Sequence, residues 1–227
     1  MRYEKIAEAR FLRRPNRFIA QVELAGREET VHVKNTGRCR ELLTPGATVY
    51  LADAWAGGGP AGRKTRYDLV AVEKGARLIN MDSQAPNKAV AEWLAAGALF
   101  PPGSAVRPEY THGDSRFDFG VFAPELALLE VKGVTLEREN VALFPDAPTL
   151  RGAKHLRHLA AFSGAGYMLF VIQMEGVECF RPNDETDPAF GRALRAARDA
   201  GVELLAYDCR VTPDSMVIGS PVEIDLS

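Results

Sequence analysis

Charged residues interrupt two apolar segments in the second half of the chain. Asp118 has a phenylalanine on each side, and Glu130 and Lys132 flank a valine that follows a run of leucines and alanine. A charge inside an otherwise buried strand is costly unless it is paired with an opposite charge or bound to a metal. Because alternate residues of a strand point to the same side, Glu130 and Lys132 are expected to share one face of a sheet.

A three-residue Ala-Pro-Glu link joins the two segments and would pair Phe122 with Leu126. That register places Asp118 opposite Glu130, roughly 5 Å away on the same face. Two carboxylates at this spacing can hold a hard divalent cation, Mg²⁺ or Mn²⁺. Lys132 could orient or deprotonate a water, or stabilise charge that develops on a phosphate, which is the chemistry of metal-dependent phosphodiester cleavage. An internal salt bridge between Lys132 and a carboxylate explains the pattern equally well.

The elements that would position these residues alternate between strands and helices. Apolar runs predict strands at residues 105–110, 115–122, 127–132, 167–172 and 202–207. Helices are predicted at residues 88–94, 155–162 and 188–200, and Asn87 is the expected N-cap of the first. Residues 83–227 are therefore expected to form an α/β domain in which helices flank a mixed sheet.

The first 80 residues have a different pattern, with no strong helical period. Short strands are expected at residues 18–24, 30–33, 48–51, 67–72 and 77–80. Five short strands in this length suit a small, partly open barrel of the OB-fold type, which is a common platform for nucleic acids. The sequence thus predicts a mixed α+β protein that begins with an OB-fold-like nucleic-acid-binding domain at residues 1–82.

Charge is divided unevenly between the two parts. The chain has 227 residues and a formal net charge of −2, but residues 1–80 hold 15 basic and 9 acidic side chains, whereas residues 81–227 hold 13 and 21. Basic side chains beside aromatic ones can supply phosphate contacts and base stacking, which favours DNA or RNA as the partner. A solvated basic surface is the alternative. The residues of the barrel expected to contact nucleic acid are Arg13, Arg14, Arg17, Lys34, Arg38 and Arg40.

Composition excludes several classes of protein. Hydrophobic residues make up 46% of the chain, which is enough for a core and too many for a disordered protein. No apolar run approaches the roughly 20 residues that cross a bilayer, and the N-terminal residues lack the apolar stretch of a secretory signal. Three widely spaced cysteines give neither a disulfide framework nor a zinc motif. A cytoplasmic protein with no membrane partner and no small-molecule cofactor is expected.

Five short motifs follow one another over nearly the whole chain. They are Asn35-Thr36-Gly37, Ser115-Arg116-Phe117-Asp118-Phe119, Glu130-Val131-Lys132-Gly133, Phe144-Pro145-Asp146-Ala147-Pro148-Thr149 and Arg151-Gly152-Ala153-Lys154-His155. In this order and spacing the sequence resembles the sugar fermentation stimulation protein family, SfsA. The resemblance implies an N-terminal OB-fold, a C-terminal PD-(D/E)xK nuclease-like domain, and a nuclease that acts on DNA or RNA. A non-catalytic DNA-binding regulator of sugar (maltose) metabolism genes is the alternative.

The resemblance also assigns residues. Asp118 and Glu130 would be ligands of Mg²⁺ or Mn²⁺ and, together with Lys132, the catalytic residues. Glu109 would complete the metal shell directly or through water. Glu92 matches a position where such nucleases place an additional acid, although its place on the predicted helix suits a solvated surface acid as well.

A proline-rich loop precedes the second predicted helix, for which Thr149 is the expected N-cap. The first turn of that helix can point at a phosphate, and Arg151 and Lys154 add positive charge there, so a substrate clamp is expected. A loop shaped only for packing is the alternative. His155 and His158 can share a face of this helix, but without a third ligand a zinc site is not expected. Sheet edges in both domains could pair in a homo-oligomer.

Overall fold

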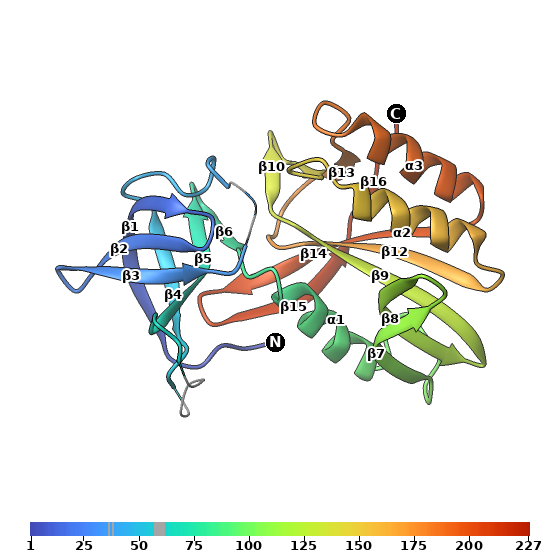
Figure 1. Ribbon diagram of the computed structural model, residues 1–227, viewed down its shortest axis with the longest axis horizontal. Helices are drawn as coiled ribbons and strands as arrows, with labels where there is room; N and C mark the ends of the chain where they lie inside the picture. Colours follow the sequence, from blue (N-terminus) through green and yellow to red (C-terminus); the bar gives the residue numbers. More distant parts are fainter. Residues whose placement is uncertain (36, 38, 57–61) are drawn as a thin grey trace.

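A computed structural model describes the chain except for residues 36, 38 and 57–61. Two regions lie side by side: a β-barrel near the N-terminus, and an α/β region that follows it (Figure 1). None of the helices in the part of the chain described is both long enough and apolar enough to cross a membrane.

The barrel closes through a parallel pair of strands. Its strands run in the order β3-β2-β1-β4-β5, and β3 pairs with β5 at His32↔Asp68 and Val33↔Leu69. This closed five-stranded barrel is OB-like, as the sequence predicts. A further strand, β6, pairs with β5 outside the closure. The bounds are β1 Ile6–Asn16, β2 Ile19–Leu24, β3 Arg27–Val33, β4 Thr48–Asp53, β5 Tyr67–Lys74 and β6 Arg77–Asn80.

The sequence pattern misses β1 and counts β6 in its place. In β1 only Ala9 and Phe11 are buried, and the strand contains Pro15. Its pairing with β2 also shifts register between Phe11 and Arg13, and again before Asn16. Such irregularities break the alternation of apolar and polar residues by which a strand is recognised in a sequence.

A six-stranded mixed sheet forms the centre of the α/β region, in the order β15-β14-β12-β9-β8-β7. The central strand β12 is parallel to both β9 and β14, whereas the outer pairs are antiparallel. The second half of β12 is entirely buried, as its apolar sequence predicts. The bounds are β7 Ala105–His112, β8 Ser115–Ala123, β9 Glu125–Val134, β12 Ala165–Ile172, β14 Glu203–Thr212 and β15 Ser215–Pro221.

Helices cover both faces of this sheet (Figure 1). They are α1 Ala85–Ala95, α2 Leu150–Ala161 and α3 Pro188–Asp199. Alternate side chains of β9 enter different cores: Leu129 and Val131 pack with residues of α1, whereas Leu128 packs with residues of α2 and α3. The predicted mixed sheet flanked by helices is therefore confirmed.

The starts of two helices test the predicted caps. Thr149 is the N-cap of α2, and its hydroxyl accepts a hydrogen bond from the N–H of Gly152 at 3.1 Å. The prediction that Asn87 caps α1 is wrong, because the N-cap is Gln84, whose side chain makes no capping bond. Pro86 lies in the first turn of α1, where a missing N–H costs nothing, so the helix begins earlier than its apolar periodicity indicates.

A smaller sheet connects the α/β region to the barrel. Its order is β10-β11-β13-β16, with bounds β10 Leu136–Arg138, β11 Val141–Phe144, β13 Cys179–Pro182 and β16 Glu223–Ile224. Glu137 of β10 is buried and forms ion pairs with Lys74 at 2.6 Å and with Arg77 at 3.2 Å. Because both cations belong to the β5–β6 hairpin, these pairs join the two regions.

Candidate active site

The β8–β9 hairpin carries Asp118, Glu130 and Lys132. The two strands pair in the predicted register as far as Phe119 and Leu129. At the next position Asp118 Oδ2 accepts a hydrogen bond from the backbone N–H of Val131 at 2.7 Å. Its other oxygen, Oδ1, accepts one from the side-chain amide of Asn87 on α1, also at 2.7 Å. Asp118 is thus fixed between β9 and the first helix.

Glu130 is one of the most deeply buried acids of the protein, with 3% of the residue exposed. Its Oε1 contacts both the ammonium of Lys132 and Nδ1 of His155. Its Oε2 is buried and has no hydrogen-bond partner among the described residues. One oxygen of this carboxylate is therefore held by two donors, and the other is left for a ligand.

The pKa values of the two carboxyl groups are shifted in opposite directions. Burial raises the pKa of Asp118, and the nearby charge of Glu130 raises it further, against the hydrogen bonds from Val131 and Asn87. Burial also opposes the charge of Glu130, but the hydrogen bond from His155 and the positive charge of Lys132 outweigh it, so the pKa of Glu130 is lowered. Pairs of acids whose pKa values are pushed apart are typical of catalytic and ion-binding sites.

Lys132 is largely buried and forms the internal salt bridge that the sequence allows as an alternative to catalysis. The two interpretations are compatible, because a lysine that contacts a ligand carboxylate is also close to whatever that carboxylate binds. The arrangement brings Asp118, Glu130 and Lys132 together, as the spacing predicts.

Glu109 and Glu92 are held away from this group. The side chain of Glu109 is 74% exposed and lies 3.8 Å from Arg116. Glu92 is 65% exposed, and its carboxylate contacts the amino group of Met1 at 2.6 Å. Since Asn87 and Glu92 are five positions apart on α1, their side chains leave the helix about 140° apart. Glu92 therefore occupies the surface position that its periodicity suggests.

The donor set fits a hard divalent cation held by few protein ligands. Among the described residues there is no group of three or more histidine, cysteine, aspartate or glutamate side chains arranged around a common point. Mg²⁺ usually keeps several waters and binds one or two carboxylates. The unpartnered Oε2 of Glu130, with Asp118 beside it, matches that requirement.

His155 contacts Glu130, and the sequence pattern did not assign it to this site. It lies on α2, is 3% exposed, and packs against Phe117 with ring centroids 5.6 Å apart. The available signal was its spacing from Leu159, which is four residues further along the same buried face of α2. That spacing predicts a buried histidine, and a buried histidine needs a polar partner.

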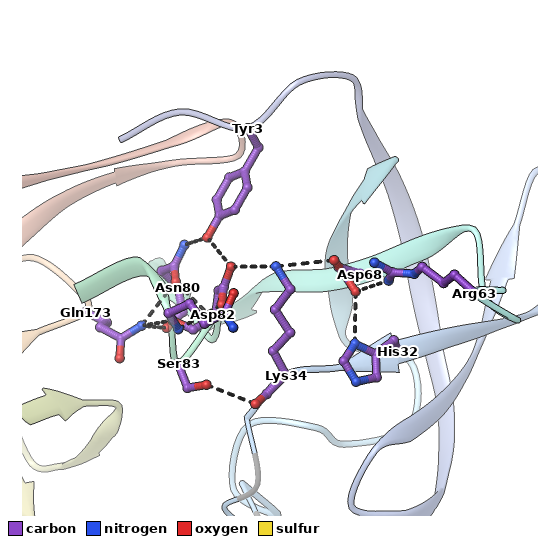
Figure 2. Close-up of polar contacts among 10 residues, drawn as sticks. Tyr3, His32, Lys34, Arg63, Asp68, Asn80, Asp82, Ser83 and Gln173 are labelled. Atoms are coloured by element: carbon purple, nitrogen blue, oxygen red, sulfur yellow. Dashed lines mark hydrogen bonds and ion pairs between the residues drawn. The ribbon is translucent and has the colours of Figure 1, made fainter. Parts of the chain in front are cut away.

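Lys34 lies in a polar network at the junction of the two regions (Figure 2). Its ammonium is 3.1 Å from Asp82, which is fully buried, and 3.3 Å from Asp68. Asp68 also contacts Arg63 and accepts from His32 at 3.0 Å. The ammonium of Lys34 thus lies between two buried carboxylates and is shared by them.

Gln173 extends this network into the α/β region. Its side-chain amide donates to the backbone carbonyls of Asn80 and Asp82, each at 3.1 Å, and to the side chain of Asn80 at the same distance. Asn80 in turn donates to the hydroxyl of Tyr3 at 3.0 Å. These contacts hold the end of β6 against the segment directly after β12.

Arg14 supports a loop of the barrel. Its guanidinium donates to the backbone carbonyls of Asn35, Gly37 and Arg17 at 2.7–2.8 Å. These bonds fix Asn35 and Gly37 after β3, so the side chain of Arg14 lies along the barrel and not toward open solvent.

The remaining basic residues predicted to contact nucleic acid are mostly exposed. Arg13 pairs with Glu28 at 2.8 Å. Arg17 lies 4.9 Å from the ring of Phe18, which is 46% exposed. Exposed residues also include Arg40 and, on α2, Arg151 and Lys154, the last of which donates to the carbonyl of Asp114 at 3.0 Å. Arg38 lies outside the described residues.

The fold and site together define a two-part protein in which an OB-like barrel is joined to an α/β region with a buried carboxylate–lysine group. Family models match both parts: the SfsA N-terminal OB domain over residues 12–81, and the sugar fermentation stimulation protein RE domain over residues 84–215. The chain belongs to the SfsA family.

Relatives of similar length support this assignment. A sugar fermentation stimulation protein homolog of Desulfitobacterium hafniense is 54% identical and is matched over 100% of this chain and 99% of its own. A homolog of Clostridium beijerinckii is 48% identical, with both chains fully covered. The solved structure of Pyrococcus furiosus SfsA in complex with Ca²⁺ matches with a TM-score of 0.87 at 26% identity, over 99% of this chain and 98% of that one.

Proposed function

We propose that this protein is a metal-dependent nuclease that hydrolyses phosphodiester bonds of DNA or RNA. The observation that carries the proposal is the buried Glu130, whose Oε1 is held by Lys132 and His155 while Oε2 has no partner among the described residues. Asp118 lies close enough to Glu130 that the charge of Glu130 raises the pKa of Asp118. A buried pair of acids with an adjacent lysine is suited to an ion that binds a phosphate.

Each residue of the group has a distinct role. Asp118 and Glu130 would hold Mg²⁺ or Mn²⁺, which when bound supplies positive charge at the phosphate and lowers the pKa of a bound water. Lys132 places its ammonium beside Glu130, where it can stabilise negative charge on the phosphate oxygens. Asn87 and the N–H of Val131 fix the direction of the Asp118 carboxylate.

Exposed basic residues of both regions support a polyanionic substrate. Arg151 and Lys154 are exposed on α2, the same helix whose buried face carries His155. On the barrel, Arg17 packs over the exposed ring of Phe18, a combination that can contact a phosphate and stack on a base. The Ca²⁺ complex of the Pyrococcus furiosus relative supports a divalent cation in this family.

Cleavage of labelled single- and double-stranded DNA and RNA, in Mg²⁺, Mn²⁺ or chelator, tests the proposal. The parent protein should cut at least one substrate, and only with metal. Lys132→Ala should be at least about 100-fold slower while still binding, because it removes a group that acts on developing charge. Lys88→Ala, an exposed lysine of α1, is the matched control and should cut like the parent. Equal rates for the two variants would remove Lys132 from the site.

A nucleic-acid-binding protein without catalysis is the second candidate, and the exposed Arg17–Phe18 pair favours it, because that pair needs no metal. It predicts binding that Arg17→Ala weakens and that chelator leaves unchanged. Binding without cleavage of any substrate in either metal would favour this candidate over the nuclease.

A further inference from the structure

His155 is a fixed donor to the carboxylate that carries the proposed function. The imidazole is 3% exposed and is enclosed by the core that α2 forms with the sheet, next to Phe117. An ionised carboxylate can only accept, so the contact with Glu130 requires a proton on Nδ1 of His155. The imidazole therefore donates to Oε1 from a direction set by the packing of α2.

Lys132 contacts the same oxygen but is held differently. Its side chain is 16% exposed, against 4% for that of His155, and it ends in a rotatable ammonium on a flexible stem. An ammonium that also serves a phosphate must be able to leave Oε1. The histidine has no such freedom, so it alone can keep the carboxylate in one orientation when Lys132 turns toward a substrate.

The orientation of the carboxylate determines where its unpartnered oxygen points. With Oε1 engaged by His155, Oε2 is the buried oxygen without a partner in the described part of the chain. Turning the carboxylate out of this plane would move both oxygens and would leave Nδ1 of His155 without an acceptor, which is costly for a buried polar group.

We propose that His155 is a positioning residue that fixes the Glu130 carboxylate so that Oε2 is presented to the divalent cation. The inference rests on the proposed metal site and goes beyond it, because it assigns to α2 the control of a ligand on β9. Hydrogen-bonded partners of metal ligands typically change metal affinity by about 10–100-fold when they are removed.

Binding of Mn²⁺ alone, measured by calorimetry and by electron paramagnetic resonance of the free ion, tests the inference without any cleavage assay. His155→Leu should lose about 10–100-fold in Mn²⁺ affinity. His155→Asn should stay within about threefold of the parent, since its amide N–H can lie near the position of Nδ1. His158→Leu is the matched control: His158 lies on the same helix but bonds the hydroxyl of Ser115 at 2.6 Å, whereas the side chain of Glu130 contacts Lys132 and His155.

The outcomes separate the inference from the proposed function. Equal Mn²⁺ affinity for His155→Leu and the parent would overturn the positioning role, and so would a parent protein that binds no Mn²⁺. A parent protein that binds Mn²⁺ but cuts no substrate would contradict the proposed nuclease activity. The positioning role of His155 would then still be decided by the Mn²⁺ affinities of the variants. If His155→Leu does not fold, His155→Gln replaces it in the test. The amide of this glutamine would extend past the position of Nδ1. A Mn²⁺ affinity of His155→Gln equal to that of His155→Asn would again overturn the inference.

Discussion

The side chain of Asn87 donates a 2.7 Å hydrogen bond to Oδ1 of Asp118, and so joins the first helix of the α/β region to the strand that carries the acid. Asparagine at the start of a predicted helix usually indicates a cap. Here the backbone of α1 begins earlier, at Ala85, and the amide is directed into the site. The bond opposes the effect of burial, because it stabilises the charged form of Asp118.

Replacing Asn87 should therefore weaken metal binding. In Asn87→Ala the Oδ1 of Asp118 loses its donor, so the charged form becomes less favourable and the carboxylate less fixed. Mn²⁺ affinity should fall by about tenfold or more, as is usual when the hydrogen-bond partner of a ligand is removed. The measurement is calorimetric titration with Mn²⁺ at neutral pH.

The control for this prediction is the true N-cap. Gln84 makes no side-chain capping bond, so Gln84→Ala should change neither Mn²⁺ affinity nor thermal stability appreciably. If both variants bind Mn²⁺ as the parent does, the bond to Asp118 has no part in ion binding.

Ion pairs between the regions should make stability depend on pH. Burial opposes the charge of Glu137, but the hydrogen bond from Lys74 and the charges of Lys74 and Arg77 lower its pKa below the ordinary value. A lowered pKa in the folded state contributes stability that is complete above the ordinary glutamate pKa of about 4.3 and is lost as the pH falls through the folded value. The ion pairs of Glu137 with Lys74 and Arg77 should thus stabilise the fold most at neutral pH and should be lost in acid.

Thermal melts from pH 7 to pH 3 check this prediction. Glu137→Gln should have a lower Tm than the parent at pH 7, and the difference should shrink as the pH falls below about 4. Glu185→Gln is the control, because that side chain is 84% exposed in its pair with Arg138 of β10. A difference between Glu137→Gln and the parent that is the same at every pH would mean that the charge does not contribute.

The sequence predicts those parts of the site that depend on local chemistry and periodicity. The register of the β8–β9 hairpin follows from a three-residue link, and the alternation in β9 brings Glu130 and Lys132 together. The partner of Glu130 on α2 could not be found in this way. His155 is 25 residues from Glu130, and only the packing of α2 on the sheet brings the two together.

In the barrel, the sequence pattern does not predict the first strand. β1 has only two buried residues and two irregularities in its pairing, so its sequence lacks the period of a strand, yet the closure of the barrel depends on it. A count of basic residues also does not show which of them are free to bind a phosphate. Lys34 adds to the basic total of the first part, but its ammonium is used by Asp68 and Asp82.

Two arginines that are close in sequence should behave differently in nucleic-acid binding. Arg17→Ala should weaken binding and reduce the slope of log affinity against log salt by about 0.7, the amount expected for one lost phosphate contact on a single strand. Arg14→Ala should mainly lower the Tm, because its guanidinium holds the carbonyls of Asn35 and Gly37. Salt titrations on a single-stranded oligonucleotide, run beside thermal melts, separate the two effects. A smaller slope for Arg14→Ala with an unchanged Tm would contradict this assignment.

The junction network makes Lys34 a determinant of stability. Lys34→Met keeps most of the side-chain volume but leaves the fully buried Asp82 and the neighbouring Asp68 without their shared cation. Breaking a buried ion pair from one side costs about 3 kcal/mol, which for a chain of this size lowers the Tm by roughly 10 °C. Arg13→Met is the matched control, because Arg13 and Glu28 are 61% and 45% exposed and such a surface pair contributes less than about 1 kcal/mol. Scanning calorimetry of the two variants decides the question: similar small losses in Tm would show that the stability of the fold does not depend on the contacts of Lys34 with Asp82 and Asp68.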